Sequence, residues 1–188
     1  MTETERLFRL AVDEFGRRVA AVPEDRWAAP TPCAEWDVRA LVNHLVYELR
    51  WAPDLLAGRT VEDVGDAYEG ELLGADPVAS WEAAADGARA AVAADGALDA
   101  TVHLSYGDSA ADDYVRQLTG DLTVHAWDLA RGAGLDDRLD PRLVRATADA
   151  VEPRQDMLAA SGLFAPPVDV GPDADDQTRL LGMFGRRA

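Results

Sequence analysis

The sequence predicts an all-α fold, a four-helix bundle with long crossover connections, a short extended segment and a C-terminal tail. Three observations support this prediction. Apolar residues recur at helical spacing in several segments, proline and glycine separate these segments, and a single short segment has strand-like composition. With 188 residues, 48% of them hydrophobic, the chain is long enough for one domain with its own core. We expect residues 1–160 to form the bundle and residues 161–188 to form the tail packed on it.

The first helices follow from periodicity and from start signals. Residues 3–22 carry apolar side chains at spacings of three and four, namely Phe8, Val12, Phe15, Val19 and Val22. The second helix begins after Asp37 as its N-cap, runs to Pro53 and continues with a kink to Ala57. Residues 58–76 form a long exposed connection. A third helix spans residues 77–94, with Pro77 in its first turn.

The second half of the chain is predicted in the same way. Residues 100–109, "ATVHLSYGDS", form a short strand or an extended crossover that ends at a Gly-Asp turn. A fourth helix spans about residues 110–131 and stops at the glycines that follow it. A fifth helix opens at Asp140 and Pro141, and Pro153 kinks it before residues 160–168, "ASGLFAPPV", end it.

The charge of the chain narrows the range of partners. There are 35 acidic and 18 basic residues, a formal charge of −17, which repels nucleic acid and anionic membrane surfaces. We see no basic leader and no run of about 18 apolar residues, so we expect a cytoplasmic protein. The single cysteine excludes an internal disulfide. A homodimer is left open.

The fourth helix carries polar groups on its apolar face. In the segment "DLTVHAWDLA", Asp121, His125 and Asp128 lie within about 60° of one another when successive residues are 100° apart. The opposite, exposed side is expected to hold Arg116, Gly120, Thr123 and Trp127. Burial of an unpaired carboxylate costs several kcal/mol, so these groups need a partner.

The second helix repeats this anomaly. His44 points inward, and Glu48 follows one turn later on the same side. A divalent metal held by His44, Asp121 and His125 would explain both helices. Two imidazoles and one carboxylate leave a fourth position open, as in catalytic zinc sites. The alternative is a metal-free polar network of the same side chains.

The remaining candidates have less specific signals. Glu48 and Asp128 are the candidate catalytic residues, which orient an imidazole or handle a proton. Asp128 could instead pair with Arg131. Cys33 is expected to be a small buried hydrophobic residue, with a role as ligand or nucleophile as the alternative. His103 is expected at the surface or in a turn. Packing or rim positions are expected for the tryptophans Trp36, Trp51, Trp81 and Trp127.

Four segments carry a resemblance to a known family: "TPCAEWDVRALVNHLV", "DLTVHAWDLARGAG", "SGLFAPPV" and "RLLGMFGR". With these segments in this order, the chain resembles the DinB-like metal-binding superfamily. It is most similar to the branch named after the N-terminal domain of mycothiol-dependent maleylpyruvate isomerase. The resemblance implies a DinB-like four-helix bundle and a divalent metal, usually zinc, with nickel as the alternative. His44, Asp121 and His125 match its ligands, with Asp121 where glutamate is common.

The resemblance also implies a function. Enzymes of this kind bind a low-molecular-weight thiol and deliver its sulfur to a small electrophile, so we expect a zinc-dependent, mycothiol-type S-transferase. The Ala- and Arg-rich, lysine-free composition indicates a bacterium with a GC-rich genome, which favours mycothiol over bacillithiol as the cosubstrate. Isomerases of this branch carry a further C-terminal domain, so we expect an activity other than isomerisation of maleylpyruvate. The alternatives are a metal-dependent hydrolase and a non-catalytic metal-binding or stress-related bundle.

Overall fold

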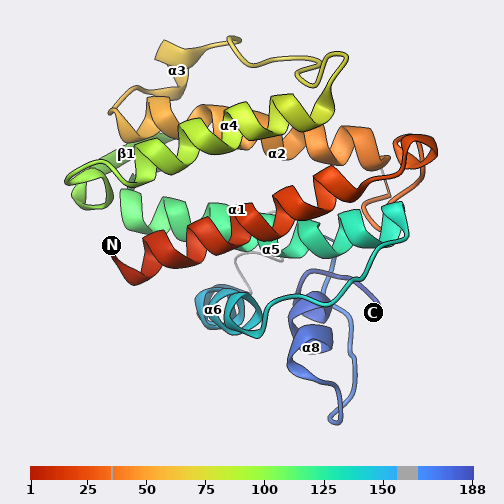
Figure 1. Ribbon diagram of the computed structural model, residues 1–188. Helices are drawn as coiled ribbons and strands as arrows, with labels where there is room; N and C mark the ends of the chain where they lie inside the picture. The colour runs from red at the N-terminus through yellow and green to blue at the C-terminus, as the bar shows by residue number, and fades with distance from the viewer. Residues whose placement is uncertain (35, 156–164) are drawn as a thin grey trace.

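The computed structural model describes residues 1–34, 36–155 and 165–188, and long helices form the body of the protein (Figure 1). These helices are α1 (Glu3–Ala21), α2 (Val38–Leu56), α4 (Pro77–Val92) and α5 (Ala111–Ala133). α1 and α2 each contact both α4 and α5, so the helices close a ring around one core. The core contains aromatic and branched side chains from all of them. The predicted all-α bundle is therefore confirmed.

The direction of the helices explains the long connections. α2 and α4 run in one direction, and α1 and α5 run in the other (Figure 1). The chain between α2 and α4 must therefore return along the whole bundle, and it contains the short helix α3 (Val61–Val64). Asn43 fixes this connection, because its Nδ2 donates to the carbonyl of Gly70 at 3.0 Å and its Oδ1 accepts from the amide of Leu72 at 2.7 Å. Leu73 is fully buried, so the connection is an ordered part of the fold.

The predicted helix starts agree with the structure. The carboxylate of Asp37 accepts from the amide of Ala40 at 2.8 Å, and that of Asp76 accepts from the amide of Ala79 at 3.0 Å. Each cap satisfies an amide that has no partner inside its helix. α2 passes through Pro53 and ends at Leu56.

The short extended segment is a hairpin. The strands β1 (Thr101–Leu104) and β2 (Gly107–Ala110) pair in antiparallel register, with His103 opposite Asp108. The second strand was not predicted, because its residues have little strand preference and pair only across the tight turn. Gly107 has φ of 121°, which favours glycine at this turn. Short 3-10 turns occur at η1 (Glu24–Arg26), η2 (Ala97–Asp99) and η3 (Glu152–Arg154).

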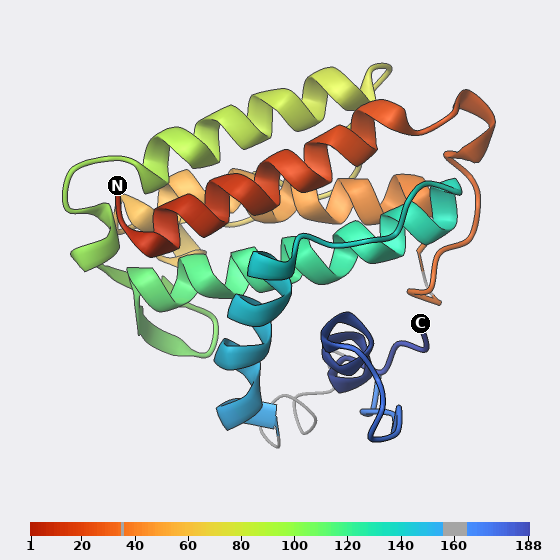
Figure 2. The same ribbon diagram turned by 60° about the horizontal axis from the view of Figure 1, so that its bottom comes forward.

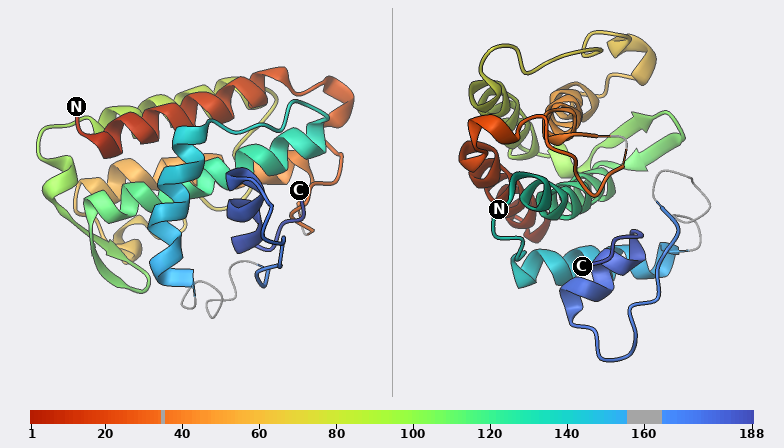
Figure 3. Two further views of the ribbon diagram at one scale, coloured as in Figure 1. Left: turned by 90° about the horizontal axis from the view of Figure 1, so that it is seen from below. Right: turned by 90° about the vertical axis from the view of Figure 1, so that its right-hand side faces the viewer.

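A second layer covers one side of α5 (Figures 2 and 3). It contains α6 (Pro141–Val151), which contacts α5, and α8 (Asp176–Met183), which contacts α6. The predicted exposed side of α5 is therefore partly wrong: Thr123 is 1% exposed and Trp127 is 2% exposed. A Cβ atom at Gly120 would lie 3.3 Å from Cγ2 of Thr147 of α6, so this glycine is also covered. α5 is buried almost all round because the chain after it folds back across it.

The end of α6 differs from the prediction. The helix ends at Val151, and Pro153 lies in η3 and not at a kink within a longer helix. Proline lacks the amide that would continue the α-helical pattern. The expected helix end at residues 160–168 lies in part outside the described residues, as does the expected boundary between residues 160 and 161.

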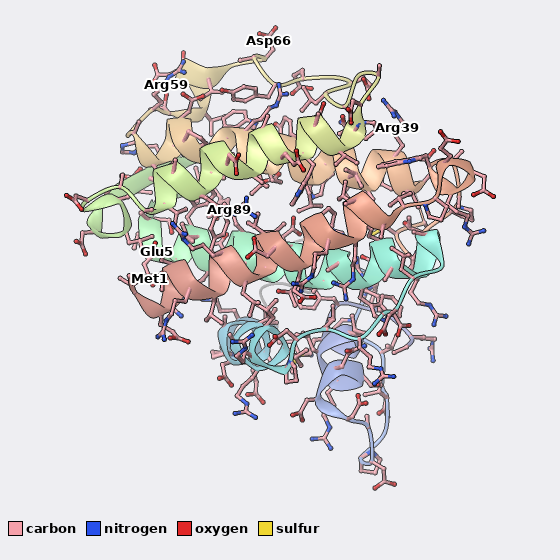
Figure 4. All side chains as sticks on the ribbon, in the orientation of Figure 1. Met1, Glu5, Arg39, Arg59, Asp66 and Arg89 are labelled. Atoms are coloured by element: carbon pink, nitrogen blue, oxygen red, sulfur yellow. The ribbon has the colours of Figure 1, made fainter. Side chains whose placement is uncertain are left out.

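Charged side chains lie mainly on the outer faces of the helices (Figure 4). Arg89 of α4 reaches toward α1, where its Nη2 donates to Asp13, and its Nη1 donates to Asp86 at 3.1 Å. Such exposed pairs contribute little to stability. In the part of the chain that the structure describes, no helix combines the length and the apolar character that crossing a membrane requires.

Candidate metal centre

His44 of α2 meets Asp121 and His125 of α5 at the contact between these helices. Nε2 of His44 lies 3.1 Å from Oδ2 of Asp121, and Nε2 of His125 lies 3.3 Å from Oδ1 of the same carboxylate. One ligand atom from each side chain lies within 4.8 Å of the other two. The structure thus brings together the three residues that the sequence proposes as metal ligands.

The position of the site follows from the packing of apolar residues around it. Leu41 and Leu45 precede and follow His44 on α2 and are buried, as are Leu122 and Leu129 on α5. These side chains hold the two helices in contact and leave the polar groups facing one another. The side chain of His125 is 4% exposed, whereas those of His44 and Asp121 are 23% and 21% exposed. The site is therefore closed on the His125 side and open to solvent on the other.

Trp36 forms a wall of this site. Its ring centroid lies 4.5 Å from that of His44 and 5.7 Å from that of His125. The loop before α2 holds Trp36 in place, because its amide donates to the carbonyl of Cys33 at 2.9 Å and its carbonyl accepts from Oγ1 of Thr31 at 2.7 Å. The expected packing or rim role of Trp36 thus includes contact with two site residues.

A second polar group lies behind His125. Nδ1 of His125 lies 2.9 Å from Oδ2 of Asp128 and 3.8 Å from Sγ of Cys33. Cys33, His125 and Asp128 also form a cluster with metal-ligand spacing. The expectation that Cys33 is only a small buried hydrophobic residue is therefore wrong. Its side chain is partly exposed and contacts polar groups, because the loop turns it toward α5.

Asp128 pairs with a residue from the far end of the chain. Nη2 of Arg186 donates to Oδ2 of Asp128 at 2.8 Å, and Nε donates to Oδ1 at 3.3 Å. The alternative pairing of Asp128 with Arg131 is wrong. Arg131 lies over the ring of Trp127, with its Cζ 5.5 Å from the ring centroid, and forms an ion pair with Asp137 at 3.1 Å. Arg131 lies about one turn after Asp128, but on the side of α5 that faces solvent, so its side chain points away from Asp128.

The charges of these groups reinforce one another. Burial alone would raise the pKa of Asp121 and lower that of His125. The mutual attraction of the two groups outweighs burial, so the pKa of Asp121 is lowered and that of His125 is raised well above its usual value. Hydrogen bonds from His125 and Arg186 likewise lower the pKa of Asp128 against the effect of burial.

Glu48 lies one turn after His44 on α2. Burial, together with the negative charge of Asp121, raises the pKa of Glu48 to about 7. Among the described residues, no hydrogen bond joins Glu48 to either imidazole, so it does not orient one of them here. His103 lies outside the site, on the hairpin, where its Nδ1 is 2.7 Å from Oδ1 of Asp108. This agrees with the expected surface or turn position.

The donor set fits a divalent cation. Bonds of about 2.0–2.1 Å place neighbouring ligand atoms of a tetrahedral zinc site about 3.4 Å apart. The distances from Asp121 to the two histidines, 3.1 and 3.3 Å, are close to this separation. Imidazole nitrogen and carboxylate oxygen are both common zinc ligands, and the hydrogen bond at Nδ1 of His125 leaves its Nε2 free to coordinate. Imidazole ligands would suit nickel as well.

Comparison with known proteins identifies the family to which most of the chain is similar. The family model described as mycothiol maleylpyruvate isomerase N-terminal domain matches residues 8–130. Two uncharacterized proteins of Mycobacterium tuberculosis, from strains CDC 1551 / Oshkosh and H37Rv, are each 33% identical to this chain over 137 residues. The similarity covers 71% of this chain and 69% of each relative. No solved structure matches the chain.

Proposed function

Because the chain belongs to the mycothiol maleylpyruvate isomerase N-terminal domain family, we propose that it is a metal-dependent S-transferase for a low-molecular-weight thiol of the mycothiol type. In this proposal His44, Asp121 and His125 bind the metal, zinc in the first instance. The thiol is transferred to a small electrophile in the cytoplasm.

One observation carries the proposal. Two imidazoles and a carboxylate from α2 and α5 converge with their ligand atoms within 4.8 Å of one another. The three side chains are more exposed on the His44 and Asp121 side, where a small molecule could reach them. Three protein ligands and an accessible side are the arrangement expected of a catalytic metal site.

The charge distribution favours this group over the cluster of Cys33, His125 and Asp128. The guanidinium of Arg186 already lies against that second cluster, at 3.0 Å from Sγ of Cys33 and 2.8 Å from Asp128. The positive charge of this guanidinium would repel a divalent metal. Its hydrogen bonds also occupy lone pairs of Cys33 and Asp128 that the metal would need. We therefore assign the metal to the Nε2 side of His125.

The residues of the chain would divide the work as follows. A bound divalent metal favours the deprotonated form of a thiol, which supplies a sulfur nucleophile at neutral pH. The carboxylate of Asp128 accepts a hydrogen bond from Nδ1–H of His125 and so orients this ring. Trp36 covers the face of His44 and limits access of water from that side. Glu48, one turn after His44 on α2, accepts the thiol proton at its carboxylate.

The proposed reaction balances without an oxidant or a reductant. The thiol loses its proton, and an electron pair on sulfur forms a bond to the electrophilic carbon. The leaving group departs with the pair of the bond that breaks. The products are the thioether and the leaving group, and Glu48 passes its proton to the leaving group or, when this is a stable anion such as chloride, to water.

The test begins with elemental analysis of the purified protein and two matched variants. We expect about one metal ion per chain in the wild type and in His103→Ala, whose imidazole lies on the hairpin. His44→Ala should lose the metal. Each protein is then incubated with a small thiol and an electrophile such as 1-chloro-2,4-dinitrobenzene, and the thioether is measured.

The outcomes separate the proposed functions. Thioether formation that requires both metal and His44 supports the transferase. Metal binding without turnover, across a panel of electrophiles, favours a non-catalytic metal-binding protein, and product formed without thiol favours a hydrolase. Wild-type protein that carries no metal and takes none up from solution contradicts the proposal as a whole.

A further inference from the structure

The chain after α8 runs back toward α5 (Figures 2 and 3). There Arg186 contacts Asp128, behind His125. Arg186 is 7% exposed and Asp128 is fully buried. The guanidinium donates to both carboxylate oxygens, from Nη2 at 2.8 Å and from Nε at 3.3 Å. This two-point contact fixes the plane of the carboxylate as well as its position.

The guanidinium is also held by groups other than Asp128. Its Nη1 donates to the carbonyl of Phe184 at 2.8 Å, and its Nη2 also donates to Sγ of Cys33 at 3.0 Å. Phe184 is 4% exposed, so the backbone that accepts from Arg186 is anchored in the core. Arg186 therefore connects three parts of the protein. These are the residues after α8, the loop that precedes α2, and the helix α5.

The contact extends to His125 through Asp128. Oδ2 of Asp128, which accepts from Arg186, also lies 2.9 Å from Nδ1 of His125. A carboxylate in this position keeps the proton on Nδ1 and sets the ring so that Nε2 faces Asp121 and His44. Without Arg186, Asp128 would be a buried carboxylate with the imidazole as its remaining charged partner and would be free to turn.

We propose that Arg186 is a positioning residue of the metal site: its guanidinium fixes Asp128, and Asp128 in turn presents Nε2 of His125 for coordination. The inference rests on the proposed metal site for its functional consequence. The family match ends at residue 130, so the C-terminal segment contributes this residue from outside the matched domain. The bundle and the last residues of the chain together form the site.

The competing explanation is that Arg186 only anchors the C-terminal segment. Arg187 offers a matched control, since it is the next residue, has the same charge and is exposed. We compare Arg186→Met, Arg186→Lys and Arg187→Met in the full chain. Lysine keeps the charge but cannot make the two-point contact, and circular dichroism reports whether each variant is folded.

The first readout is Zn²⁺ affinity, measured in competition with a chromophoric chelator. We expect Arg186→Met to bind Zn²⁺ about tenfold more weakly, at the lower end of the range for loss of a direct partner of a metal ligand, because Arg186 acts on His125 through Asp128. Arg186→Lys should lose less, and Arg187→Met should stay within about twofold of the wild type. If a folded Arg186→Met or Arg186→Lys binds Zn²⁺ as tightly as Arg187→Met, the inference is overturned, whatever happens to thermal stability.

The second readout does not need a metal. Proton–nitrogen NMR of the metal-free protein should show a downfield Nδ1 proton on His125 that exchanges slowly with water in the wild type and in Arg187→Met. In Arg186→Met this proton should exchange faster or disappear, with a partial effect in Arg186→Lys. An unchanged signal in both Arg186 variants overturns the inference. If the wild type binds no Zn²⁺, the proposed function fails, and this NMR comparison still decides the role of Arg186.

Discussion

Nε2 of His44 lies 3.1 Å from Oδ2 of Asp121, although 77 positions separate the two residues in the chain. The opposite oxygen of this carboxylate faces His125. Asp121 thus links the imidazoles of two helices, and it can do so either by direct hydrogen bonds or as one ligand of a shared cation. Four predictions test this arrangement and the packing that supports it.

Substitution of His125 should abolish thiol transfer. His125→Ala removes the proposed ligand that is most deeply buried, so we expect at least a 100-fold loss of activity, beyond the range of about 10–100-fold for outer partners of a ligand. The measurement is thioether formation at saturating thiol. His103→Ala should retain wild-type activity. If His125→Ala kept its activity, the assignment of the site would be wrong.

Removal of metal should lower the melting temperature. A ligand at 100 times its Kd stabilises the folded state by about 2.7 kcal/mol, which corresponds to roughly 5–10 °C for a chain of this size. Calorimetry before and after chelation, followed by addition of Zn²⁺, measures this shift. His44→Ala should show no response to either treatment. An equal melting temperature for treated and untreated wild type would mean that the side chains satisfy one another without a cation.

Glu48 should make the metal-free protein less stable as the pH rises. The folded-state pKa of about 7 exceeds the ordinary value of 4.5, so the folded state keeps a proton that the unfolded state has lost. The stability that protonated Glu48 contributes is fully present below pH 4.5, is lost between pH 4.5 and 7, and amounts to roughly 3 kcal/mol.

Glu48→Gln tests this effect because glutamine does not titrate. Urea unfolding of both metal-free proteins between pH 5 and 8 should show that the variant becomes the more stable one as the pH rises. Asp121, His44 and His125 interact electrostatically with Glu48, so the difference between the two proteins measures Glu48 together with its coupling to these groups. Parallel stability curves would show that Glu48 has an ordinary pKa in solution.

Two glycine-to-alanine substitutions, one at a crowded position and one at an open position, test the packing of the loop that carries Cys33 and Trp36. A Cβ atom at Gly132 of α5 would lie 2.9 Å from Cγ2 of Thr31 and 3.2 Å from the carbonyl of Pro30. Gly132→Ala should therefore destabilise the protein by about 1–3 kcal/mol and displace the loop. In Gly87→Ala, the new methyl group meets only Cγ of Pro53 at 3.9 Å.

Gly87→Ala should therefore stabilise the protein by up to about 1 kcal/mol, because alanine favours the helix and Gly87 lies on its exposed side. Thermal unfolding of both variants checks the pair, and Trp fluorescence reports whether the loop has moved. Equal effects of the two substitutions on stability would mean that the loop can move away from the new methyl group without destabilising the protein.

Helical periodicity was sufficient to predict the residues that converge from α2 and α5. His44, Asp121 and His125 are anomalies within regular patterns, and such anomalies are visible without a structure. Cys33 and Trp36 lie in an irregular loop, where no helical or strand periodicity predicts which way a side chain points. They nevertheless stand in the same sequence motif as the start of α2. Arg186 ends the segment "RLLGMFGR", which carries part of the family resemblance, but the sequence assigns it no role, because that role depends on a tertiary contact across 58 positions.

The same limit explains the error at Trp127. A helical wheel gives the angle of a residue but does not say how many neighbours surround the helix. The wheel assumed one buried side for α5, whereas the fold places the bundle on one side and the layer of α6 and α8 on the other. The side that looked exposed is thus a second buried interface.

The connection between α2 and α4 has a consequence for local opening of the protein. Asn43 binds this connection with both ends of its amide and is the residue before His44. Detachment of the connection would expose Leu73 and release a side chain from the turn of α2 that bears His44. Hydrogen exchange in residues 70–73 and in this turn should therefore follow one cooperative unit, in which the connection and the turn of α2 that contains His44 open together.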